Sequence, residues 1–348
     1  MRADVKQQLE AAVGRENMLT EREDMAPYLQ EWRGHFTCEA AAVLRPGSTQ
    51  EVAAVVRVCA QHGVGVVPQG GNTGLVGGAA AQTQDQVVVS LSRLRQVRSV
   101  DVENDSITVE AGCVLAQVQT AAEEASRLFP LSLAAEGSCQ IGGNLATNAG
   151  GLNVLRYGNA RDLCLGLEVV LADGSVWNGL GALRKDNSGF DLKQVFIGSE
   201  GALGIITAAT LKLFPPLRQT ETAFIALEDP KSAIRLLNEL RRETGDNLIA
   251  CELIPRFAIE LVTRHVERCR DPFSSEHPWY LLIEAATPAS GEWLGTAVKA
   301  VLQKALEEGL VSDAVLAESL QHAEDFWRIR ENIPGAQVSE GASIKHDV

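Results

Sequence analysis

The chain has 348 residues, of which 45% are hydrophobic and 22% are charged, so it is long enough for roughly two globular domains. Its formal net charge of −14 argues against nucleic acid as a partner, because phosphate binding needs a basic surface. No apolar run approaches the roughly 20 residues that a membrane-spanning helix needs.

The first residues and the cysteines indicate the cellular compartment of the protein. The start, MRADVKQQLEAAVGREN, is charged and lacks the apolar middle of a secretory signal peptide. The seven cysteines are scattered and include no CxxC pair, a pattern typical of reduced thiols. We therefore expect a cytoplasmic protein.

The first clear element is a helix that begins after Ser48. Ser48 and Glu51 have the spacing of a capping box, apolar residues then recur at helical intervals, and Gly63 ends the helix. The next residues, 64–67 (VGVV), predict a short buried strand that leads directly into a glycine-rich loop.

More strands follow this loop. The pair Asp173-Gly174 lies between two apolar runs and predicts a β-hairpin. The expected strands are 86–91, 106–111, 167–172 and 175–177. Residues 45–213 therefore indicate an α+β domain.

The tandem prolines Pro215 and Pro216 predict a domain boundary, because they end regular structure. We expect one domain over residues 1–215 and a second, incomplete one over residues 216–348. In the second, strands alternate with helices, which predicts a layer of helices on one sheet. The expected segments are strands 222–227, 248–254, 279–286 and 310–316, and helices 230–243, 256–268, 291–308 and 319–332.

Residues 66–78, VVPQGGNTGLVGG, place five glycines directly after the predicted strand. Glycine adopts positive φ without a steric penalty, so successive backbone amides can turn into one anion-binding concavity. Asn72 and Thr73 add side-chain donors. The loop has neither the Walker pattern GxxxxGK[ST] nor a GxGxxG that opens a helix. It indicates a pyrophosphate site built mainly from backbone, with a tight turn at a crowded strand end as the alternative.

Two further stretches are rich in glycine and small polar residues. Residues 136–151 are EGSCQIGGNLATNAGG, and residues 197–207 are IGSEGALGIIT. Small residues allow a flat ring or a ribityl chain to lie against the backbone. Three such stretches in one domain predict a long cofactor laid across a sheet, with phosphates at one end and a planar ring at the other.

These stretches, together with LGLEVVLADGS, RKDNSGFDLKQVF and WRIRENI, resemble the FAD-linked D-2-hydroxyacid dehydrogenases, which are vanillyl-alcohol-oxidase (PCMH-type) flavoproteins. The similarity covers nearly the whole chain and is strongest to the D-2-hydroxyglutarate dehydrogenases of that family. D-lactate dehydrogenase and the glycolate oxidase flavoprotein subunit are further relatives. The resemblance implies a PCMH-type FAD-binding domain of two α+β subdomains, followed by a ferredoxin-like α+β cap domain.

The resemblance also implies which residues hold the FAD. The loop from Pro68 to Leu75 corresponds to the pyrophosphate loop of the family, and the two later stretches contact the rest of the cofactor. Asn72 stands where some superfamily members attach flavin through a histidine, so we expect non-covalent FAD. The implied cofactor-binding residues are Pro68, Gly70, Gly71, Asn72, Thr73, Gly74, Leu75, Gly137, Ser138, Gly142, Gly143, Asn144, Thr147, Asn148, Gly150, Gly151, Glu200, Gly201 and Ile206.

Two cations, Arg330 and Lys345, correspond to the positions at which the family binds the substrate carboxylates. An arginine holds a carboxylate through two parallel hydrogen bonds, whereas a lysine acts as a point charge. By residue type alone, a solvated surface charge is the alternative for either. Pro334 departs from the family, because some relatives have a substrate-contacting threonine there.

The catalytic base of these relatives lies in a C-terminal H-x-x-G-D-G-N motif, which does not occur in the 348 residues. The six histidines show no spacing that favours a metal site. The last residues, SIKHDV, form a strand-like run without a following turn. We therefore expect a fragment, with the base, and any divalent metal such as zinc, in a longer chain beyond Val348.

The expected activity is FAD-dependent oxidation of D-2-hydroxyglutarate or D-lactate to the 2-oxoacid, by hydride transfer to the flavin N5. The electrons would pass to an electron-transfer flavoprotein, a quinone or a cytochrome, and a homodimer is one assembly that we consider. Two alternatives stay open. One is an FAD-dependent non-redox transferase of the alkyl-dihydroxyacetone-phosphate synthase type, and the other is a non-catalytic FAD-binding fragment.

Overall fold

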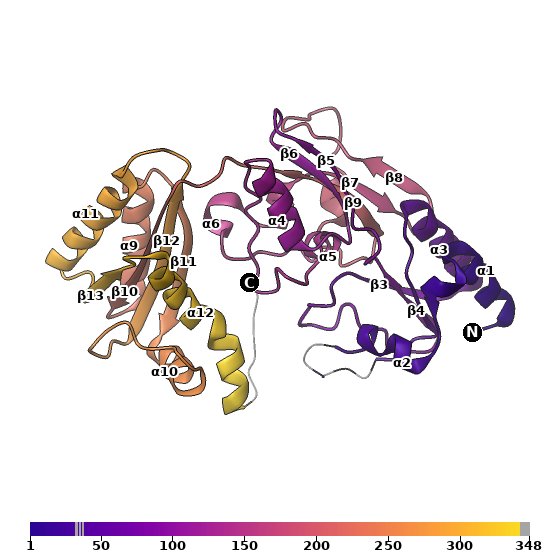
Figure 1. The fold of residues 1–348 in the computed structure, drawn as a ribbon, viewed down its shortest axis with the longest axis horizontal. Coiled ribbons are helices and arrows are strands. Elements are labelled where there is room, and N and C mark those ends of the chain that lie inside the picture. Colours follow the sequence, from indigo (N-terminus) through magenta and orange to yellow (C-terminus); the bar gives the residue numbers. More distant parts are fainter. Residues whose placement is uncertain (32–33, 35, 37, 342–348) are drawn as a thin grey trace. The chain divides into compact units, whose positions relative to one another are not determined.

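The computed structural model describes residues 1–31, 34, 36 and 38–341. The chain forms two compact units (Figure 1): unit 1 comprises residues 1–151 and 158–215, and unit 2 comprises residues 152–157 and 216–348. Unit 2 thus takes in the short segment Leu152–Tyr157 from within the span of unit 1. Its one helical turn is too short to show a periodic pattern, so the sequence gives no signal for it.

The first sheet of unit 1 has four strands in the order β1-β2-β4-β3. The strands β2, β3 and β4 run parallel, whereas β1 pairs antiparallel with β2. The strands are β1 (Met18–Leu19), β2 (Ala42–Leu44), β3 (Gly65–Gln69) and β4 (Gln86–Ser90). The helices of this part are α1 (Ala3–Val13), α2 (Arg22–Met25) and α3 (Thr49–His62), with short 3-10 helices η1 (Arg15–Asn17) and η2 (Ala26–Tyr28).

Helix α3 confirms the first predicted element. The Ser48 hydroxyl accepts a hydrogen bond from the Glu51 amide at 3.2 Å, and Gly63 ends the helix with φ of 66°. The Glu51 carboxylate accepts from the Gly47 amide at 2.7 Å, one residue before the partner that a capping box would use. The helix returns the chain to a parallel strand, a connection that no tight turn can make.

The second sheet of unit 1 has five antiparallel strands in the order β5-β6-β9-β7-β8. The predicted hairpin is present: Gly174 has φ of 78°, and the Leu171 amide donates to the Ser175 carbonyl at 2.9 Å. The strands are β5 (Val97–Asp101), β6 (Ser106–Glu110), β7 (Cys164–Val170), β8 (Val176–Gly179) and β9 (Ile205–Lys212). The helices are α4 (Leu115–Glu124), α5 (Ile141–Ala146), α7 (Ala160–Leu163) and α8 (Lys193–Phe196).

Unit 2 has one antiparallel sheet in the order β11-β12-β10-β13. Counted within the unit, this order is 2-3-1-4, which is the ferredoxin-like arrangement that the resemblance implies. The strands are β10 (Gln219–Leu227), β11 (Leu248–Pro255), β12 (Trp279–Thr287) and β13 (Asp313–Leu316). The helices are α6 (Val154–Tyr157), α9 (Pro230–Glu243), α10 (Arg256–His265), α11 (Trp293–Glu307) and α12 (Leu320–Glu340).

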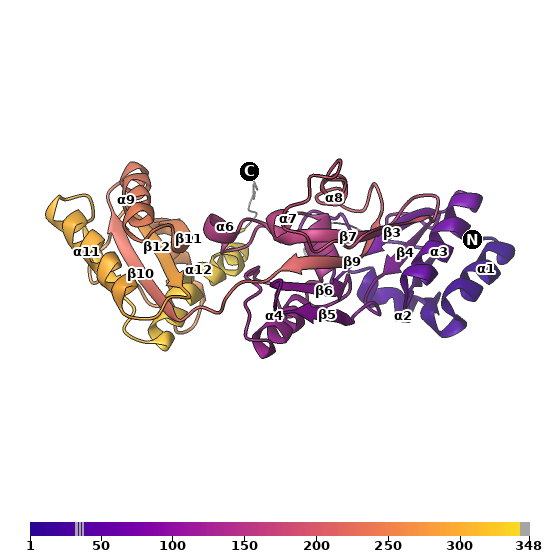
Figure 2. The ribbon, with the colours of Figure 1, turned by 90° about the horizontal axis from the view of Figure 1, so that it is seen from above.

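Helices cover both faces of the unit 2 sheet, so the expectation of one helical layer is wrong. Helices α9 and α11 lie on one face and α12 lies on the other (Figure 2). The reason lies in the strands: Phe224 and Ile225 are neighbours on β10 and point to opposite faces, yet both are fully buried. A strand that is apolar on both sides needs a cover on each.

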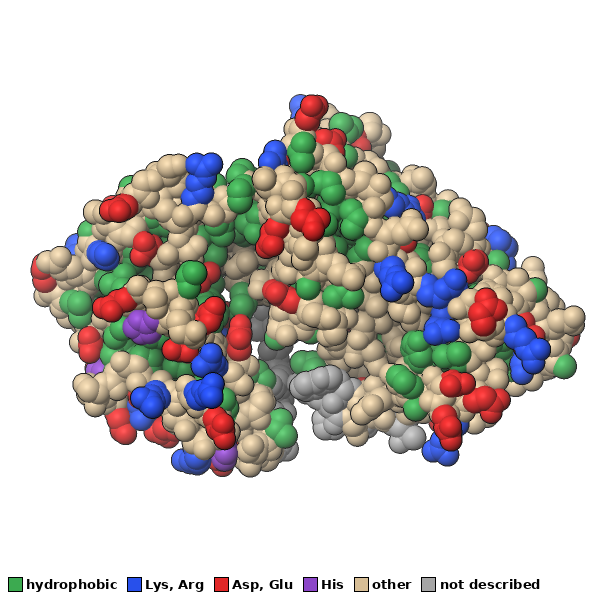
Figure 3. All heavy atoms as spheres, in the orientation of Figure 1, with side chains coloured by type: hydrophobic (Ala, Val, Ile, Leu, Met, Phe, Trp, Pro, Cys, Tyr) green, Lys and Arg blue, Asp and Glu red, His purple; other side chains and the backbone are tan. Residues whose placement is uncertain are grey.

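The surface of the described part carries both signs of charge. In Figure 3, acidic and basic side chains lie on the surface of each unit. Among the described residues, no helix is both long enough and apolar enough to cross a membrane.

Candidate functional site

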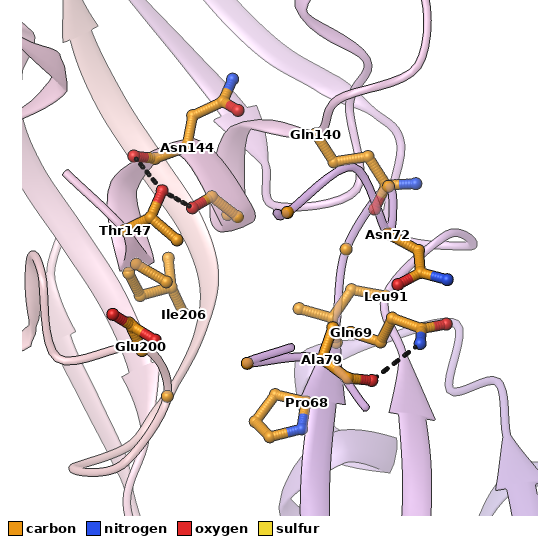
Figure 4. A pocket seen from close by; sticks show the side chains of 18 of the residues that line it. Pro68, Gln69, Asn72, Ala79, Leu91, Gln140, Asn144, Thr147, Glu200 and Ile206 are labelled. Atoms are coloured by element: carbon orange, nitrogen blue, oxygen red, sulfur yellow. Dashed lines mark hydrogen bonds between the residues drawn. The ribbon is translucent and has the colours of Figure 1, made fainter. Parts of the chain in front are cut away.

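The three glycine-rich stretches meet at one cavity of unit 1 (Figure 4). The first contributes the loop after β3, the second contributes α5, and the third contributes the turn before β9. The predicted cofactor residues that line the cavity are Pro68, Gly70, Gly71, Asn72, Thr73, Gly74, Gly142, Gly143, Asn144, Thr147, Glu200, Gly201 and Ile206. Folding thus brings together backbone and small side chains that are far apart in the sequence.

The other predicted cofactor residues do not line this cavity, and these are Leu75, Gly137, Ser138, Asn148, Gly150 and Gly151. Two of them make close contacts with other segments of unit 1. The Asn148 side-chain oxygen accepts a hydrogen bond from the Arg161 amide at 3.0 Å. Gly151 has φ of 86°, and a Cβ there would lie 2.1 Å from the Ser132 carbonyl oxygen.

Glycine lets the walls of the cavity approach each other closely. A Cβ on Gly71 would lie 2.1 Å from the carbonyl oxygen of Ser138, and one on Gly201 would lie 2.8 Å from Cγ of Pro68. Any side chain at Gly71 would therefore push the first loop away from the second stretch. The positions of these glycines are set by contacts between loops and not only by local turns.

One non-glycine residue in each stretch has a left-handed backbone: Asn72, Asn148 and Glu200 have φ of 53°, 51° and 52°. Such residues are uncommon, and they cluster at functional sites. The Asn72 side-chain amide donates to the Gln30 carbonyl at 2.8 Å, which anchors the loop. This side-chain amide is thus engaged with Gln30, and the backbone amide is the other hydrogen-bond donor at this position.

Two buried polar atoms in the cavity wall lack a hydrogen-bond partner among the described residues. They are Oε1 of Gln140 and Nδ2 of Asn144, in side chains that are 8% and 5% exposed. A buried polar atom without a partner costs about 1–3 kcal/mol, which a bound polar ligand would relieve. A cavity wall with such atoms suits a ligand that carries hydroxyl or amide groups.

The sequence did not predict that Gln140 is a residue of this site. This residue lies at the N-cap of α5 and makes no side-chain capping bond there. Its neighbours Gly142 and Gly143 mark the segment, but only the placement of α5 turns the side chain toward the cavity. The lining residues absent from the prediction are Gln69, Val76, Gly78, Ala79, Leu91, Gln140, Ala146, Gly204 and Ile205.

The cavity is poor in charge. Among the described residues that line it, Glu200 is the only charged one, and none is a lysine or arginine. A diphosphate here would be bound by backbone amides in the glycine loop, as a nest of N–H groups binds an anion. Together, these features of the cavity fit an FAD molecule. The glycine loop suits the phosphates, the small residues suit the flat ring, and the polar atoms without a partner suit the hydroxylated ribityl chain.

The predicted substrate residues belong to unit 2. Arg330 lies on α12, and its Nε donates to Oε2 of Glu252 on β11 at 2.6 Å. Helix α12 continues through Pro334, beyond the predicted end at residue 332. Lys345 lies outside the described residues, as does the strand-like run 343–348.

Metal ligands and thiols are dispersed in the part of the chain that the structure describes. No group of three or more His, Cys, Asp or Glu side chains is arranged there to hold a metal ion. All seven cysteines are free. Burial raises the pKa of Cys59 and of Cys113 to about 11, so both thiols stay protonated at neutral pH.

Two segments of the chain match known families. Residues 40–179 match the FAD binding domain family, and residues 217–348 match the C-terminal domain of FAD linked oxidases. A mitochondrial D-2-hydroxyglutarate dehydrogenase from Arabidopsis thaliana is 41% identical over 337 residues, which cover 97% of this chain and 60% of that protein. A D-2-hydroxyglutarate dehydrogenase from Xanthomonas citri is 38% identical over 98% of this chain and 70% of its own.

Relatives that are named mitochondrial contradict the cytoplasmic location expected from the sequence. The Arabidopsis relative is named mitochondrial, and so are relatives from cattle and rat. The expectation was wrong because a charged start argues only against a secretory signal. Mitochondrial targeting segments are amphipathic and polar, so they escape that test.

A solved structure supports the fold. The crystal structure of p-cresol methylhydroxylase with substrate bound has a TM-score of 0.74, at 20% identity over 94% of this chain and 68% of its own. At this identity the likeness shows the PCMH-type fold alone. The chain spans about 60% of the length of the Arabidopsis relative and 70% of the Xanthomonas one. From its sequence, its fold and these matches, the chain belongs to the D-2-hydroxyglutarate dehydrogenase family of FAD-linked oxidoreductases.

Proposed function

We propose that this chain provides the FAD site and part of the substrate site of a dehydrogenase that oxidises a D-2-hydroxyacid, with D-2-hydroxyglutarate as the first candidate. The main support is the meeting of three glycine-rich stretches at one cavity with two orphaned polar atoms. Relatives named D-2-hydroxyglutarate dehydrogenase support the choice of substrate.

Within unit 1, each part of the cavity has a proposed task. The backbone amides of residues 70–74 hold the diphosphate, and the small residues of α5 allow the ribityl chain and the ring to approach. Asn144 donates and Gln140 accepts hydrogen bonds. FAD held in this way, without a covalent bond, supplies a two-electron acceptor for the carbon that bears the substrate hydroxyl.

Unit 2 is proposed to bind the substrate. The Arg330 guanidinium holds a substrate carboxylate, and Lys345 adds a second positive charge by analogy with the family. The electrons then leave to a protein or quinone acceptor, such as an electron-transfer flavoprotein or a cytochrome. A homodimer stays a prediction.

The test is the visible spectrum of the complete, purified protein, which includes the residues expected beyond Val348, during an anaerobic titration with D-2-hydroxyglutarate. We expect flavin bands that bleach with this compound and do not bleach with the L enantiomer. Bleaching by D-lactate alone would reassign the substrate. Stable flavin bands with every hydroxyacid would favour the non-redox transferase. A folded protein that takes up no flavin after addition of FAD would overturn the proposal.

A further inference from the structure

Arg330 and Glu252 form an ion pair on one face of the unit 2 sheet. The Nε atom of Arg330 lies 2.6 Å from Oε2 of Glu252, and the two side chains are 31% and 22% exposed. No other described residue forms a hydrogen bond or salt bridge with the Arg330 side chain. The guanidinium is therefore held at Nε, while its Nη1 and Nη2 atoms have no partner in the described part of the chain.

This arrangement differs from that of Arg256 in the same unit. Arg256 uses Nε, Nη1 and Nη2 to contact Glu260, Asp271 and Glu276, so all sides of its guanidinium are engaged. A guanidinium can bind a carboxylate through two parallel hydrogen bonds along either of two edges. One edge consists of Nε and one Nη atom, and the other consists of the two Nη atoms. In Arg330, Glu252 occupies Nε, and the edge with both Nη atoms remains for a ligand.

A second contact holds the same helix in register with the sheet. Trp327 precedes Arg330 by three residues, so the two side chains leave α12 on the same side. The Trp327 Nε1 donates to Oε2 of Glu284 on β12 at 2.8 Å. The pairing of β11 with β12 places Glu252 and Glu284 on the same sheet face. Two acidic residues on neighbouring strands thus fix the rotation of α12, and with it the direction of Arg330.

We propose that Glu252 is a positioning residue, which holds Arg330 through Nε so that its two Nη atoms bind a substrate carboxylate end-on. This inference rests on the proposed function, because it takes from that proposal that Arg330 binds the substrate. The ligand is thereby specified as a carboxylate that accepts two parallel hydrogen bonds. Glu252 does not have to leave when the ligand binds, because the two carboxylates use different edges of the guanidinium.

The experiment measures KM and kcat for D-2-hydroxyglutarate in the complete, FAD-loaded protein. Glu252→Ala is expected to raise KM about tenfold, the effect of one hydrogen bond to a charged group, with kcat changed less than about twofold. Glu252→Gln keeps an acceptor at the same place and should stay within about threefold of the wild-type KM. Arg330→Lys keeps the charge but loses the paired donors, so it should resemble Arg330→Ala.

A double-mutant cycle separates positioning from general damage to the fold. In the Arg330→Ala background, Glu252→Ala should have no further effect on KM, because the group that it positions is absent. Asp246→Ala is the matched control. Its carboxylate also binds an arginine through Nε, that of Arg241 at 2.8 Å, but both side chains are largely exposed, at 63% and 46%. It should leave KM unchanged.

Three results would overturn the inference. A lower KM in Glu252→Ala would show that Glu252 competes with the ligand. An unchanged KM in Glu252→Ala, together with a raised KM in Arg330→Ala, would remove the positioning role and leave the proposed function intact. An unchanged KM in Arg330→Ala would refute the proposed role of Arg330 itself, and the inference that rests on it.

Discussion

Thr49 on α3 donates a hydrogen bond to the carboxylate of Glu168 on β7 at 2.7 Å, which joins the helix of the first sheet to the second sheet of unit 1. Glu168 also accepts from Thr207 at 2.9 Å and from Arg98 at 3.1 Å, and its side chain is 11% exposed. Thr207 directly follows Ile206, which lines the cavity. One buried carboxylate thus connects α3, β5, β7 and β9 next to the candidate site.

Removal of this carboxylate should destabilise unit 1. Glu168→Ala leaves the buried Thr49 hydroxyl without its acceptor and removes one of the two acceptors of Thr207 and of Arg98, so the free energy of unfolding should fall by about 2 kcal/mol. Chemical denaturation followed by circular dichroism measures the change. The exposed Glu124→Ala serves as the control and should lie within about 0.5 kcal/mol of wild type. Equal stability of the two variants would contradict a structural role for Glu168.

The Glu168 carboxylate also predicts that the stability of the folded protein depends on pH. Burial acts to raise the pKa of Glu168, but hydrogen bonds from Arg98, Thr49 and Thr207 outweigh it and keep the pKa below its usual value. The ionised form therefore stabilises the folded state. This contribution is complete above the unfolded pKa of about 4.3 and is lost as the pH falls toward the lowered folded value. Between about pH 5 and pH 3, the melting temperature of wild type should fall more steeply than that of Glu168→Gln.

The close approach of two loops at Gly71 gives a third prediction. A Cβ at this position would lie 2.1 Å from the Ser138 carbonyl oxygen, whereas a Cβ at Gly74 would meet nothing within 4 Å. Gly71→Ala should therefore cost about 2 kcal/mol of folding stability and weaken FAD binding, because the cavity walls move apart. Gly74→Ala should leave the melting temperature of the FAD-free protein unchanged. Thermal denaturation compares the two, and equal melting temperatures would argue against the loop contact.

We expect the Gln140 side chain to bind FAD and, because its polar atom has no partner without FAD, to lower the stability of the FAD-free protein. Gln140→Met keeps the volume and removes the buried polar atom without a partner, so the FAD-free protein should melt no lower than wild type. Its dissociation constant for FAD should rise about tenfold, as measured by quenching of flavin fluorescence. Gln119→Met is the opposite control, because the Gln119 amide donates to the Leu131 carbonyl at 2.9 Å. It should lower stability and leave FAD affinity unchanged. Unaltered FAD affinity in Gln140→Met would exclude Gln140 from the site.

Pro334 is expected to weaken α12. It lies inside the helix, where it has no N–H for the carbonyl of Arg330 one turn earlier. Pro334→Ala should stabilise the protein by about 2 kcal/mol. Gly335→Ala, at the next helical position, should give the smaller gain of about 1 kcal/mol, since only backbone entropy changes. A lower melting temperature in Pro334→Ala would mean that the packing of the last turns depends on the proline.

Much of the fold was predictable because its signals are local. The N-cap at Ser48, the end at Gly63 and the hairpin at Gly174 each depend on residues a few positions apart. The strands and helices of unit 2 lie close to their predicted ranges for the same reason, with differences at the ends. The predicted helix 256–268 stops at His265, and the one predicted to end at residue 332 continues to Glu340.

By itself, the sequence determined the elements, the glycine-rich stretches and the family resemblance, since these lie in local spacing and residue type. Only the tertiary structure decided that Gln140 faces the cavity, that Gly71 meets Ser138, and that Leu152–Tyr157 joins unit 2. It also paired Arg330 with Glu252, which is 78 positions away. The physical reason is that the partner and exposure of a side chain depend on which distant segments pack against it, and no local pattern encodes that choice.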